Sequence, residues 1–557
     1  MELSKLARAL LEERYLLRNA DGEVIETPEM MFGRVSRHVS QGGDHELDEE
    51  KILHMLTNLE FLPNSPTLMN AGSELGQLSA CFVLPVKDSI EGIFDAVKNM
   101  AIIHKSGGGT GFSFSELRPK GDLIKSTMGQ SSGPISFMNV FDTTTAAITQ
   151  GGRRRGANMG ILDVDHPDIE SFIDLKCNGG VLENFNLSVA VTDKFMRMVK
   201  ENRDFPLINP RTKKIVKKIP AGEIFDKISK AAWACGDPGL IFIDEINRAN
   251  PTPELGLIKS TNPCGEIPLY SFESCNLGSI NLAKVIKGGN IDWEKLKNLV
   301  ITGVEFLDNV IDANKYPLHE IDVETKKNRK IGLGVMGFAD MLILLGIKYN
   351  EPKTLEIAAK VMKFIQEEAR NASIALGIER GSFPNFDKSI YKDKVEAMRN
   401  ATRTAIAPTG TISLIASCSP SIEPIFSIYH VRKIFGIGDV EFFHPLLIQQ
   451  LKEMGANLQE ILDKIKRTSG IDPSVLPGDL PDLYVNALSI TPEWHLKVQS
   501  TFQEHVDNSV SKTINLPEEA TIEDVKNIFM RAHDLKCKGI TIYRNKSKEE
   551  QVLNLRQ

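Results

Sequence analysis

Residues 260–268 read Ser-Thr-Asn-Pro-Cys-Gly-Glu-Ile-Pro. Prolines and a glycine this close together exclude a helix, so the segment is expected to be an extended loop. Side chains two residues apart in an extended chain point to the same side. Asn262, Cys264 and Glu266 would then share one face, which combines an amide, a thiol that can accept a hydrogen atom and a carboxylate that can act as a base. A loop with a merely buried cysteine has the same spacing, so this pattern alone does not decide a function.

Two further cysteines lie in segments of similar character. Cys275 stands in Glu-Ser-Cys-Asn-Leu-Gly-Ser at 273–279, and Cys81 stands in Ser-Ala-Cys-Phe at 79–82, at the entry to an expected strand. Two such thiols can meet across a sheet as a reversible disulfide, but only geometry decides whether they do. Each taken singly is more often a small buried apolar side chain.

Composition and charge exclude several classes of protein. The 557 residues are 41% hydrophobic and 25% charged, which is typical of a globular protein. The net charge of −7 argues against a nucleic-acid partner, because binding to phosphates needs a concentrated basic surface. The seven cysteines contain no CxxC pair and the N-terminus has no apolar leader, so we expect a reducing, cytoplasmic setting. The most apolar stretch, 331–347, contains Asp340 and is expected to be a buried strand, turn and helix rather than a membrane span.

Outside the 260–268 segment, the hydrophobic pattern changes once along the chain. Leucines and isoleucines at helical spacing mark residues 1–60, and strand-like and helical runs alternate after Phe61. The clearest expected strands are 81–86, 187–191 and 240–243, and the clearest expected helices are 89–104 and 223–235. Residues 404–407 and 411–415 flank a Pro-Thr-Gly turn. This alternation predicts an α/β fold with mostly parallel strands.

Four segments have glycines or hydroxyls that suit phosphate binding through backbone N–H groups. They are Asn-Ser-Pro-Thr at 64–67, Ser-Gly-Gly-Gly-Thr-Gly at 106–111, Gln-Gly-Gly-Arg-Arg-Arg-Gly at 150–156 and Ala-Pro-Thr-Gly-Thr-Ile-Ser at 407–413. Each is weak alone, because such turns are common. Residues 332–337 match GxGxxG, but the charged run before them is unsuited to a buried strand, so a nicotinamide-dependent oxidoreductase stays only as an alternative.

Taken together and in this order, the motifs resemble the large catalytic subunit of ribonucleotide reductase. Phe-Leu-Pro-Asn-Ser-Pro-Thr-Leu-Met-Asn-Ala-Gly at 61–72 and Ser-Glu-Leu-Arg-Pro-Lys-Gly at 115–121 belong to the same series. The resemblance spans about residues 10 to 553 and is closest to the adenosylcobalamin-dependent class, class II. It implies a ten-stranded α/β barrel of two parallel five-stranded halves, with Cys264 on a finger loop that reaches into the centre. The expected domains are a helical N-terminal region at 1–60, the barrel at 61–545 and an exposed tail at 546–557.

The resemblance also implies a role for each residue of the site. A thiyl radical at Cys264 would take the 3′ hydrogen of a ribose, Glu266 would take the 3′-hydroxyl proton, and Asn262 would hold the sugar hydroxyls. Cys81 and Cys275 would then supply two electrons and close as a disulfide. A thioredoxin- or glutaredoxin-like reductant would reopen that disulfide at each turnover. The implied reaction reduces ribonucleotides, expected as diphosphates, to 2′-deoxyribonucleotides.

Substrate and effector residues follow from the same resemblance. The residues expected to contact the substrate and its phosphates are Ser65, Ala80, Gly109, Pro408, Thr409, Gly410, Thr411 and Ile412. Asp88 and Arg118 match a specificity site at the interface of a homodimer, where deoxynucleotides or ATP would bind. Arg154 lies in the 150–156 loop, which would relay the identity of the effector to the choice of base. No side chain is expected to bind a metal.

The source of the radical separates the classes of this family. Subunits driven by a partner protein pass the radical through two adjacent tyrosines near the C-terminus, but here Ile542 replaces one of them beside Tyr543. A glycyl-radical segment is not found either, because Gly539 is followed by Ile540. Adenosylcobalamin is therefore the expected cofactor, bound with its own base because no DxHxxG segment offers a histidine to cobalt. A subunit served by a separate radical-generating protein and a non-catalytic nucleotide-binding regulator remain as alternatives.

Two departures from the family pattern carry expectations of their own. No helical activity domain precedes Phe61, so inhibition by dATP through such a domain is not expected. Cys537 is the last cysteine and stands alone. Either a C-terminal cysteine pair has been truncated or an external reductant acts on the active-site pair directly.

Overall fold

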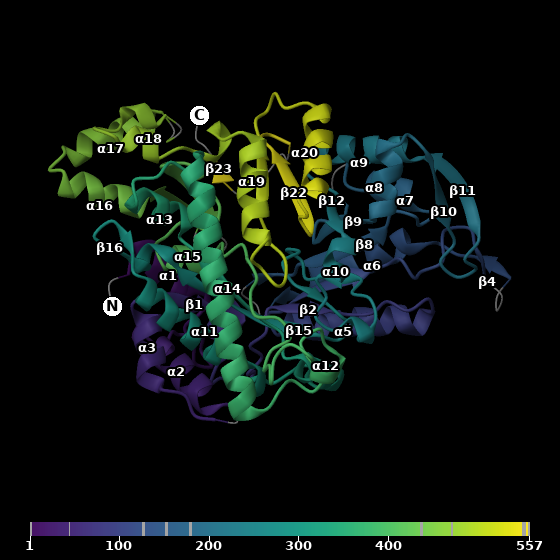
Figure 1. The fold of residues 1–557 in the computed structure, drawn as a ribbon, viewed down its shortest axis with the longest axis horizontal. Coiled ribbons are helices and arrows are strands. Elements are labelled where there is room, and N and C mark those ends of the chain that lie inside the picture. The colour runs from purple at the N-terminus through teal and green to yellow at the C-terminus, as the bar shows by residue number, and fades with distance from the viewer. Residues whose placement is uncertain are drawn as a thin grey trace.

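The computed structural model describes residues 3–43, 45–124, 128–150, 154–177, 181–434, 438–468, 470, 472–547 and 553–554. Three helices precede the first strand and lie together at the lower left in Figure 1: α1 (Lys5–Arg14), α2 (Pro28–Gln41) and α3 (Glu49–Thr57). Ser4, Thr27 and Asp48 cap these helices, and each side chain accepts a hydrogen bond from the backbone N–H three residues later. The caps fix where each helix starts. The apolar faces of the three helices pack into one core with the strands that follow.

Five strands of the first half of the sheet run parallel to one another. In spatial order they are β2 (Cys81–Val83), β3 (Gly109–Ser113), β8 (Asn158–Asp163), β9 (Phe185–Val191) and β12 (Gly239–Phe242). The helices between them include α5 (Ile90–Lys105), α6 (Pro134–Ala147), α7 (Ile169–Ile173), α8 (Asp193–Lys200) and α9 (Ala221–Cys235). Parallel strands need such crossover connections, which is why strand and helix patterns alternate along this part of the chain.

The second half is also parallel and closes the ring. Its strands are β15 (Ser274–Asn281), β18 (Ile331–Met336), a segment at 404–406, β21 (Thr513–Leu516) and β22 (Gly539–Arg544). Single parallel bridges from Leu333 to Thr404 and from Ile406 to Val510 join the middle of this half. The two halves meet antiparallel at β15 with β2 and at β12 with β22. The predicted barrel of two parallel five-stranded halves is therefore confirmed.

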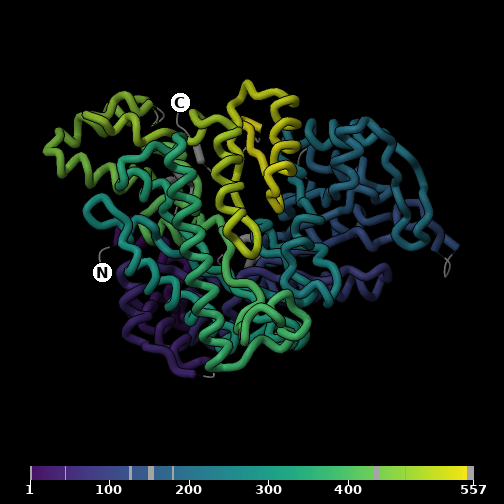
Figure 2. The backbone as a smooth tube through the Cα atoms, viewed as in Figure 1, coloured from purple at the N-terminus to yellow at the C-terminus, as the bar shows by residue number. Residues whose placement is uncertain are grey.

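Helices cover the second half from outside. They include α11 (Trp293–Ala313), α12 (His319–Asn328), α13 (Phe338–Leu344), α14 (Pro352–Arg380), α19 (Pro492–Gln503) and α20 (Ile522–Asp534). Figure 2 shows the first half in blue on the right and the second half in green on the left, with the yellow C-terminal segment returning beside the blue part. An outlying group at the upper left contains α16 (Pro445–Glu453), α17 (Leu458–Arg467) and α18 (Leu480–Leu483). The shorter elements include β1 (Phe61–Pro63), α4 (Ser65–Asn70), β6 (Thr149–Gln150), β7 (Arg154–Arg155), β13 (Ser260–Thr261), β14 (Pro268–Leu269), α15 (Ile412–Ile415), β19 (Tyr429–Ile434) and β23 (Leu553–Asn554).

Most sequence-based expectations for single elements hold. The apolar stretch 331–347 forms β18, a turn at Gly337 and α13, as predicted, and among the described residues no helix is long and apolar enough to cross a bilayer. The segments around the Pro-Thr-Gly turn differ in kind, because 404–406 forms only single bridges and Ile412–Ile415 forms the helix α15. Within the predicted tail, Leu553–Asn554 pairs with β19, and most of the other tail residues lie outside the described part. The domain limits remain a prediction.

Candidate active site

A short hairpin carries the 260–268 motif into the barrel. Strands β13 and β14 pair antiparallel, and the turn between them is closed by Asn262 N–H to Ile267 O (3.2 Å) and by Gly265 N–H to Asn262 O (3.1 Å). Gly265 has a φ of +81°, which a glycine adopts without strain. The expected extended loop was therefore wrong, because the Asn262 side chain also accepts a hydrogen bond from Ile267 N–H (3.0 Å) and folds the segment back on itself. The tight turn, rather than strand alternation, sets the directions of the three side chains.

Glycines of β3 make room for this hairpin. A Cβ atom on Gly111 would lie 1.7 Å from the carbonyl oxygen of Thr261, and one on Gly109 would lie 2.9 Å from Cγ of Pro263. On the other side, Asn186 of β9 donates a hydrogen bond from Nδ2 to the carbonyl of Pro263 (2.8 Å). The Ser-Gly-Gly-Gly-Thr-Gly segment, which suggested phosphate binding, thus also supplies a bare strand surface against which the hairpin packs.

Cys81 and Cys275 face each other across the junction of the two half-barrels. They are directly opposed residues of the antiparallel pair β2 and β15, and their exposed fractions are 3% and 1%. Directly opposed residues have Cβ atoms about 4.5–5.5 Å apart, close to the separation that a disulfide spans. Both are present as thiols, and burial raises the pKa of each well above its ordinary value. The sequence left this pairing open, and the register of the two strands brings the two thiols together.

Asn262 and Glu266 lie against this thiol pair. Asn262 donates a hydrogen bond from Nδ2 to Sγ of Cys81 (3.1 Å), and both Asn262 and Glu266 are 2% exposed. The backbone carbonyl of Glu266 accepts a hydrogen bond from Ser509 N–H (2.9 Å), which ties the hairpin to the second half-barrel. Oε2 of Glu266 is buried and has no hydrogen-bond partner among the described residues. Burial raises the pKa of Glu266 to about 7, against the hydrogen bond from Asn262, so the carboxyl can exchange a proton near neutral pH.

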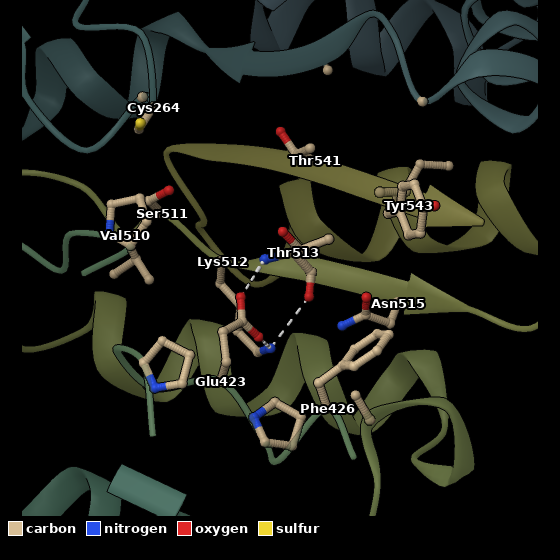
Figure 3. Close-up of a pocket in the computed structure, with 18 of the residues that line it drawn as sticks. Cys264, Glu423, Phe426, Val510, Ser511, Lys512, Thr513, Asn515, Thr541 and Tyr543 are labelled. Carbon is tan, nitrogen blue, oxygen red and sulfur yellow. Dashed lines mark hydrogen bonds and ion pairs between the residues drawn. The ribbon is translucent and has the colours of Figure 1, made fainter. Parts of the chain in front are cut away.

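Cys264 stands at the tip of the hairpin and is exposed to a cavity of about 590 Å³. Figure 3 shows Cys264 above Val510 and Ser511, with Thr541 and Tyr543 of β22 along one wall and Phe426 farther from the thiol. Most of the lining is apolar, and it includes Met159, Leu240, Ile241, Leu414, Ile425, Phe426, Phe442 and Ile540. The tip therefore presents its thiol to this cavity.

A charged pair on the cavity wall had no signal in the sequence. Nζ of Lys512 bonds to a carboxylate oxygen of Glu423, and the other oxygen accepts a hydrogen bond from Thr513 N–H (2.8 Å), as drawn in Figure 3. The Lys512 side chain is fully buried, and burial lowers its pKa. These two residues are far apart in the chain and belong to no recognisable motif, so only the fold brings them together.

Three of the predicted substrate residues, Ala80, Gly109 and Pro408, adjoin the thiol pair or line the cavity. Ala80 N–H donates to Cys275 O (3.3 Å), and Gly109 N–H donates to Ala80 O (2.8 Å), so both adjoin the Cys81–Cys275 junction. Ser65 is the first residue of α4, and its hydroxyl lies 2.8 Å from that of Tyr15. Pro408 lines the cavity together with Cys264.

The turn after Pro408 is held in an unusual backbone conformation. Thr409 has a φ of +52°, and its hydroxyl accepts a hydrogen bond from Ser421 N–H (2.7 Å). Gly410 and Thr411 follow, and Ile412 begins α15. This bond fixes the turn at the cavity edge, and its role in phosphate binding remains a prediction.

Two of the three predicted effector residues meet. Nε of Arg118 lies 2.9 Å from a carboxylate oxygen of Asp88, and Arg118 N–H also donates to that carboxylate (3.1 Å). Arg154 belongs to β7, which pairs with β6, but its side chain and residues 151–153 lie outside the described part of the structure. The effector role of all three residues remains a prediction.

Comparison with known proteins identifies the family. The family profile described as ribonucleotide reductase, barrel domain, matches residues 79–543, and that described as ribonucleotide reductase, all-alpha domain, matches residues 1–76. The chain belongs to the ribonucleotide reductase family. The family resemblance found in the sequence is thus confirmed.

Individual reductases agree with this membership. The chain is 48% identical to the vitamin B12-dependent ribonucleoside-diphosphate reductase of Thermoplasma acidophilum, covering 99% of this chain and 80% of that protein. It is 46% identical to the protein of the same name from Mycobacterium tuberculosis, covering 100% of this chain and 81% of the relative. The solved structure of the Actinobacillus ureae class Id ribonucleotide reductase alpha subunit superposes with a TM-score of 0.80 at 24% identity, covering 98% of this chain and 97% of that one. This structural similarity supports the barrel fold.

Proposed function

We propose that this protein is an adenosylcobalamin-dependent ribonucleoside-diphosphate reductase of class II. The names and high identity of the relatives from Thermoplasma and Mycobacterium support the cofactor and the diphosphate substrate. The structural observation that carries the proposal is the position of the hairpin: Asn262 contacts Cys81 opposite Cys275, while Cys264 faces the cavity.

The cavity beside Cys264 fits a large cofactor of mixed polarity. Apolar side chains such as Leu414, Ile425 and Phe426 would lie against a corrin ring, and the Lys512–Glu423 pair offers charged and polar atoms to its substituents. When bound, adenosylcobalamin supplies an unpaired electron through homolysis of its cobalt–carbon bond. His430 and His444 also line the cavity, so binding with the cofactor's own base remains a prediction that an EPR spectrum of the cob(II)alamin form would test.

The residues of the hairpin would perform the reaction on the ribose. Cys264, as a thiyl radical, takes the 3′ hydrogen atom and later returns one to the same carbon. Glu266 accepts the 3′-hydroxyl proton, for which its raised pKa near 7 and its unpartnered oxygen are suited. Replacing the 2′-hydroxyl by hydrogen, with its release as water, needs two protons and two electrons, and the Cys81–Cys275 thiol pair supplies both as it closes to a disulfide.

The partners follow from this chemistry. The disulfide formed at each turnover must be reduced by an external dithiol, of thioredoxin or glutaredoxin type, that gains access to the buried pair. We further propose a homodimer in which deoxynucleotide or ATP effectors bind near the Asp88–Arg118 ion pair and bias the choice of base.

The decisive experiment supplies purified chain with a ribonucleoside diphosphate, adenosylcobalamin and dithiothreitol, and separates the deoxyribonucleotide product by chromatography. We expect repeated turnover only when all three are present, and no more than one product per chain without dithiothreitol. Cys264→Ser should lower the rate at least about a thousandfold, because the atom that abstracts hydrogen is gone. Product formed without adenosylcobalamin, or by the Cys264→Ser variant, would contradict the proposal.

A further inference from the structure

A second pair of cysteines lies outside the site described above. Sγ of Cys177 and Sγ of Cys235 are 3.8 Å apart, although the residues are 58 positions apart in the sequence. Cys235 is the last residue of α9, and Cys177 lies after α7. Both are present as thiols, Cys177 exposed and Cys235 half-buried.

Neighbouring contacts hold the two segments together. Nζ of Lys176, the residue before Cys177, lies 3.3 Å from Oδ2 of Asp237, two residues after Cys235, and their side chains are only 13% and 10% exposed. The same ammonium group donates a hydrogen bond to the carbonyl of Phe185. Sγ of Cys235 donates to the carbonyls of Ala231 and Asp237, both at 3.3 Å. Contacts of Lys176 and Asp237, which are neighbours of the two cysteines, thus hold their segments together.

Neither apolar packing nor metal binding accounts for this pair. Cys418 and Cys537 are buried and behave as small apolar side chains, whereas Cys177 is exposed and cannot be explained by packing. A structural zinc site needs about four ligands, and among the described residues no group of three histidine, cysteine or acidic side chains is placed to hold a metal ion. Thiol–disulfide chemistry remains as the chemistry that two adjacent thiols support.

We infer that Cys177 and Cys235 form a second thiol–disulfide site, which a low-molecular-weight disulfide such as oxidised glutathione converts to an intramolecular bond. The exposed Cys177, as thiolate, attacks one sulfur of glutathione disulfide and releases one glutathione thiol. Cys235 then attacks Sγ of Cys177, forms the protein disulfide and releases the second glutathione thiol. Two electrons pass from the protein to the oxidant, and the two protein protons end on the two glutathione thiols.

The geometry needs only a small adjustment for this bond. A disulfide is about 2.05 Å long, so the two sulfur atoms must approach by roughly 1.8 Å, which side-chain rotation at the exposed Cys177 can provide. Although the side chain is exposed, partial loss of solvent around its sulfur atom, and after it the neighbouring Cys235 thiol, raises the pKa of Cys177 to about 12. The attack is therefore slow at neutral pH, and the site stays reduced until oxidant is abundant.

The site is separate from the reaction but adjoins its cavity. Gly236 and Asp237, which follow Cys235, line the cavity wall, and Asp237 accepts a hydrogen bond from Leu187 N–H (3.1 Å). Neither cysteine of this pair lines the cavity or contacts Asn262, Cys81 or Glu266 among the contacts of the described residues. The inference therefore stands independently of the proposed function.

Peptide mapping without reduction tests whether Cys177 and Cys235 form this disulfide. The full-length protein is incubated with oxidised glutathione, remaining thiols are alkylated, and the tryptic digest is searched for peptide 177–194 joined to peptide 231–248. We expect the linked species in the wild type and its loss after dithiothreitol. In Cys235→Ser it should be replaced by a glutathione adduct on Cys177, because the resolving thiol is gone. Cys418→Ser, which alters a buried cysteine elsewhere, is the matched control and should retain the linked species.

Two results would overturn the inference. One is a wild-type digest in which Cys177 carries glutathione but is never joined to Cys235. The other is a digest in which both cysteines stay alkylated while the Cys81 and Cys275 peptides become linked. Native mass spectrometry of each variant confirms that it is folded before oxidation.

Discussion

Two cysteine pairs in this protein are each brought together from distant parts of the sequence, yet they differ in surroundings. Cys81 and Cys275 are opposed on neighbouring strands inside the barrel, under a hairpin that adds an amide, a carboxyl and a third thiol. Cys177 lies in a loop and Cys235 at the end of a helix, beside a Lys–Asp ion pair, and both are at least partly exposed. The comparison shows that the two pairs share close sulfur atoms, while only Cys81 and Cys275 lie beneath the hairpin that carries Asn262, Cys264 and Glu266.

The sharpest test of this comparison removes one thiol from each pair. Cys81→Ser should lower steady-state reduction with dithiothreitol at least about a thousandfold, because a single thiol cannot deliver two electrons. Cys177→Ser should stay within about twofold of the wild type, as expected for an exposed side chain remote from the chemistry. Initial rates of deoxyribonucleotide formation measure both.

The partner cysteines provide the matched controls. Cys275→Ser should behave as Cys81→Ser does, and Cys235→Ser as Cys177→Ser does. Equal losses from both pairs would remove the distinction drawn between them.

The second test concerns Glu266, the buried carboxyl group beside Cys81 and Cys275. Glu266→Gln should lower the rate about a hundredfold, because the amide cannot accept the 3′-hydroxyl proton. Wild-type activity should rise with pH through about 7 as Glu266 loses its proton, and the variant should lack this rise. A pH–rate profile over roughly pH 5.5 to 8.5 distinguishes the two, and an unchanged profile in the variant would assign the titration to another group.

Unfolding measurements test the raised pKa of Glu266 without relying on activity. Because burial raises the folded-state pKa of Glu266 from 4.5 to about 7, its contribution to stability is present below pH 4.5 and is lost as pH rises through 7. The loss is on the order of 3 kcal/mol. Glu266→Gln should therefore be less sensitive to pH than the wild type in this range, which also shows that the variant is folded.

The third and smallest expected effect comes from the strand beneath the hairpin. Gly111→Ala should cost about 1–3 kcal/mol of folding free energy, because the added Cβ meets the Thr261 carbonyl at 1.7 Å. Gly33→Ala is the control, since Gly33 lies in α2 with no atom within 4 Å of the added carbon, and it should be neutral or stabilising by up to about 1 kcal/mol. Chemical denaturation measures both. Oxidation of Cys177 and Cys235 should be unchanged in Gly111→Ala, and a parallel loss there would mean that the two regions are coupled.

The resemblance to the family predicted the barrel, because the motifs that carry it are long and occur in a fixed order, while the roles of the site residues remain a prediction. The sequence did not predict how the motif around Cys264 folds, since alternation describes an extended chain and the Asn262 side chain closes a turn instead. It also missed Asn186 and the Lys512–Glu423 pair, which act through contacts between segments far apart in the chain. Cys177 and Cys235 carried no local signal either, because their proximity depends on how α9 packs beside the first half-barrel.

Asn262 joins two tasks in one side chain. Its oxygen holds the turn that carries Cys264, and its nitrogen bonds to the sulfur of Cys81. In the proposed reaction, Cys81 passes from thiol to disulfide, so the acceptor of the Asn262 amide group changes its bonding. The turn that carries Cys264 would thus be coupled, through a single side chain, to the oxidation state of the cysteine pair beneath it.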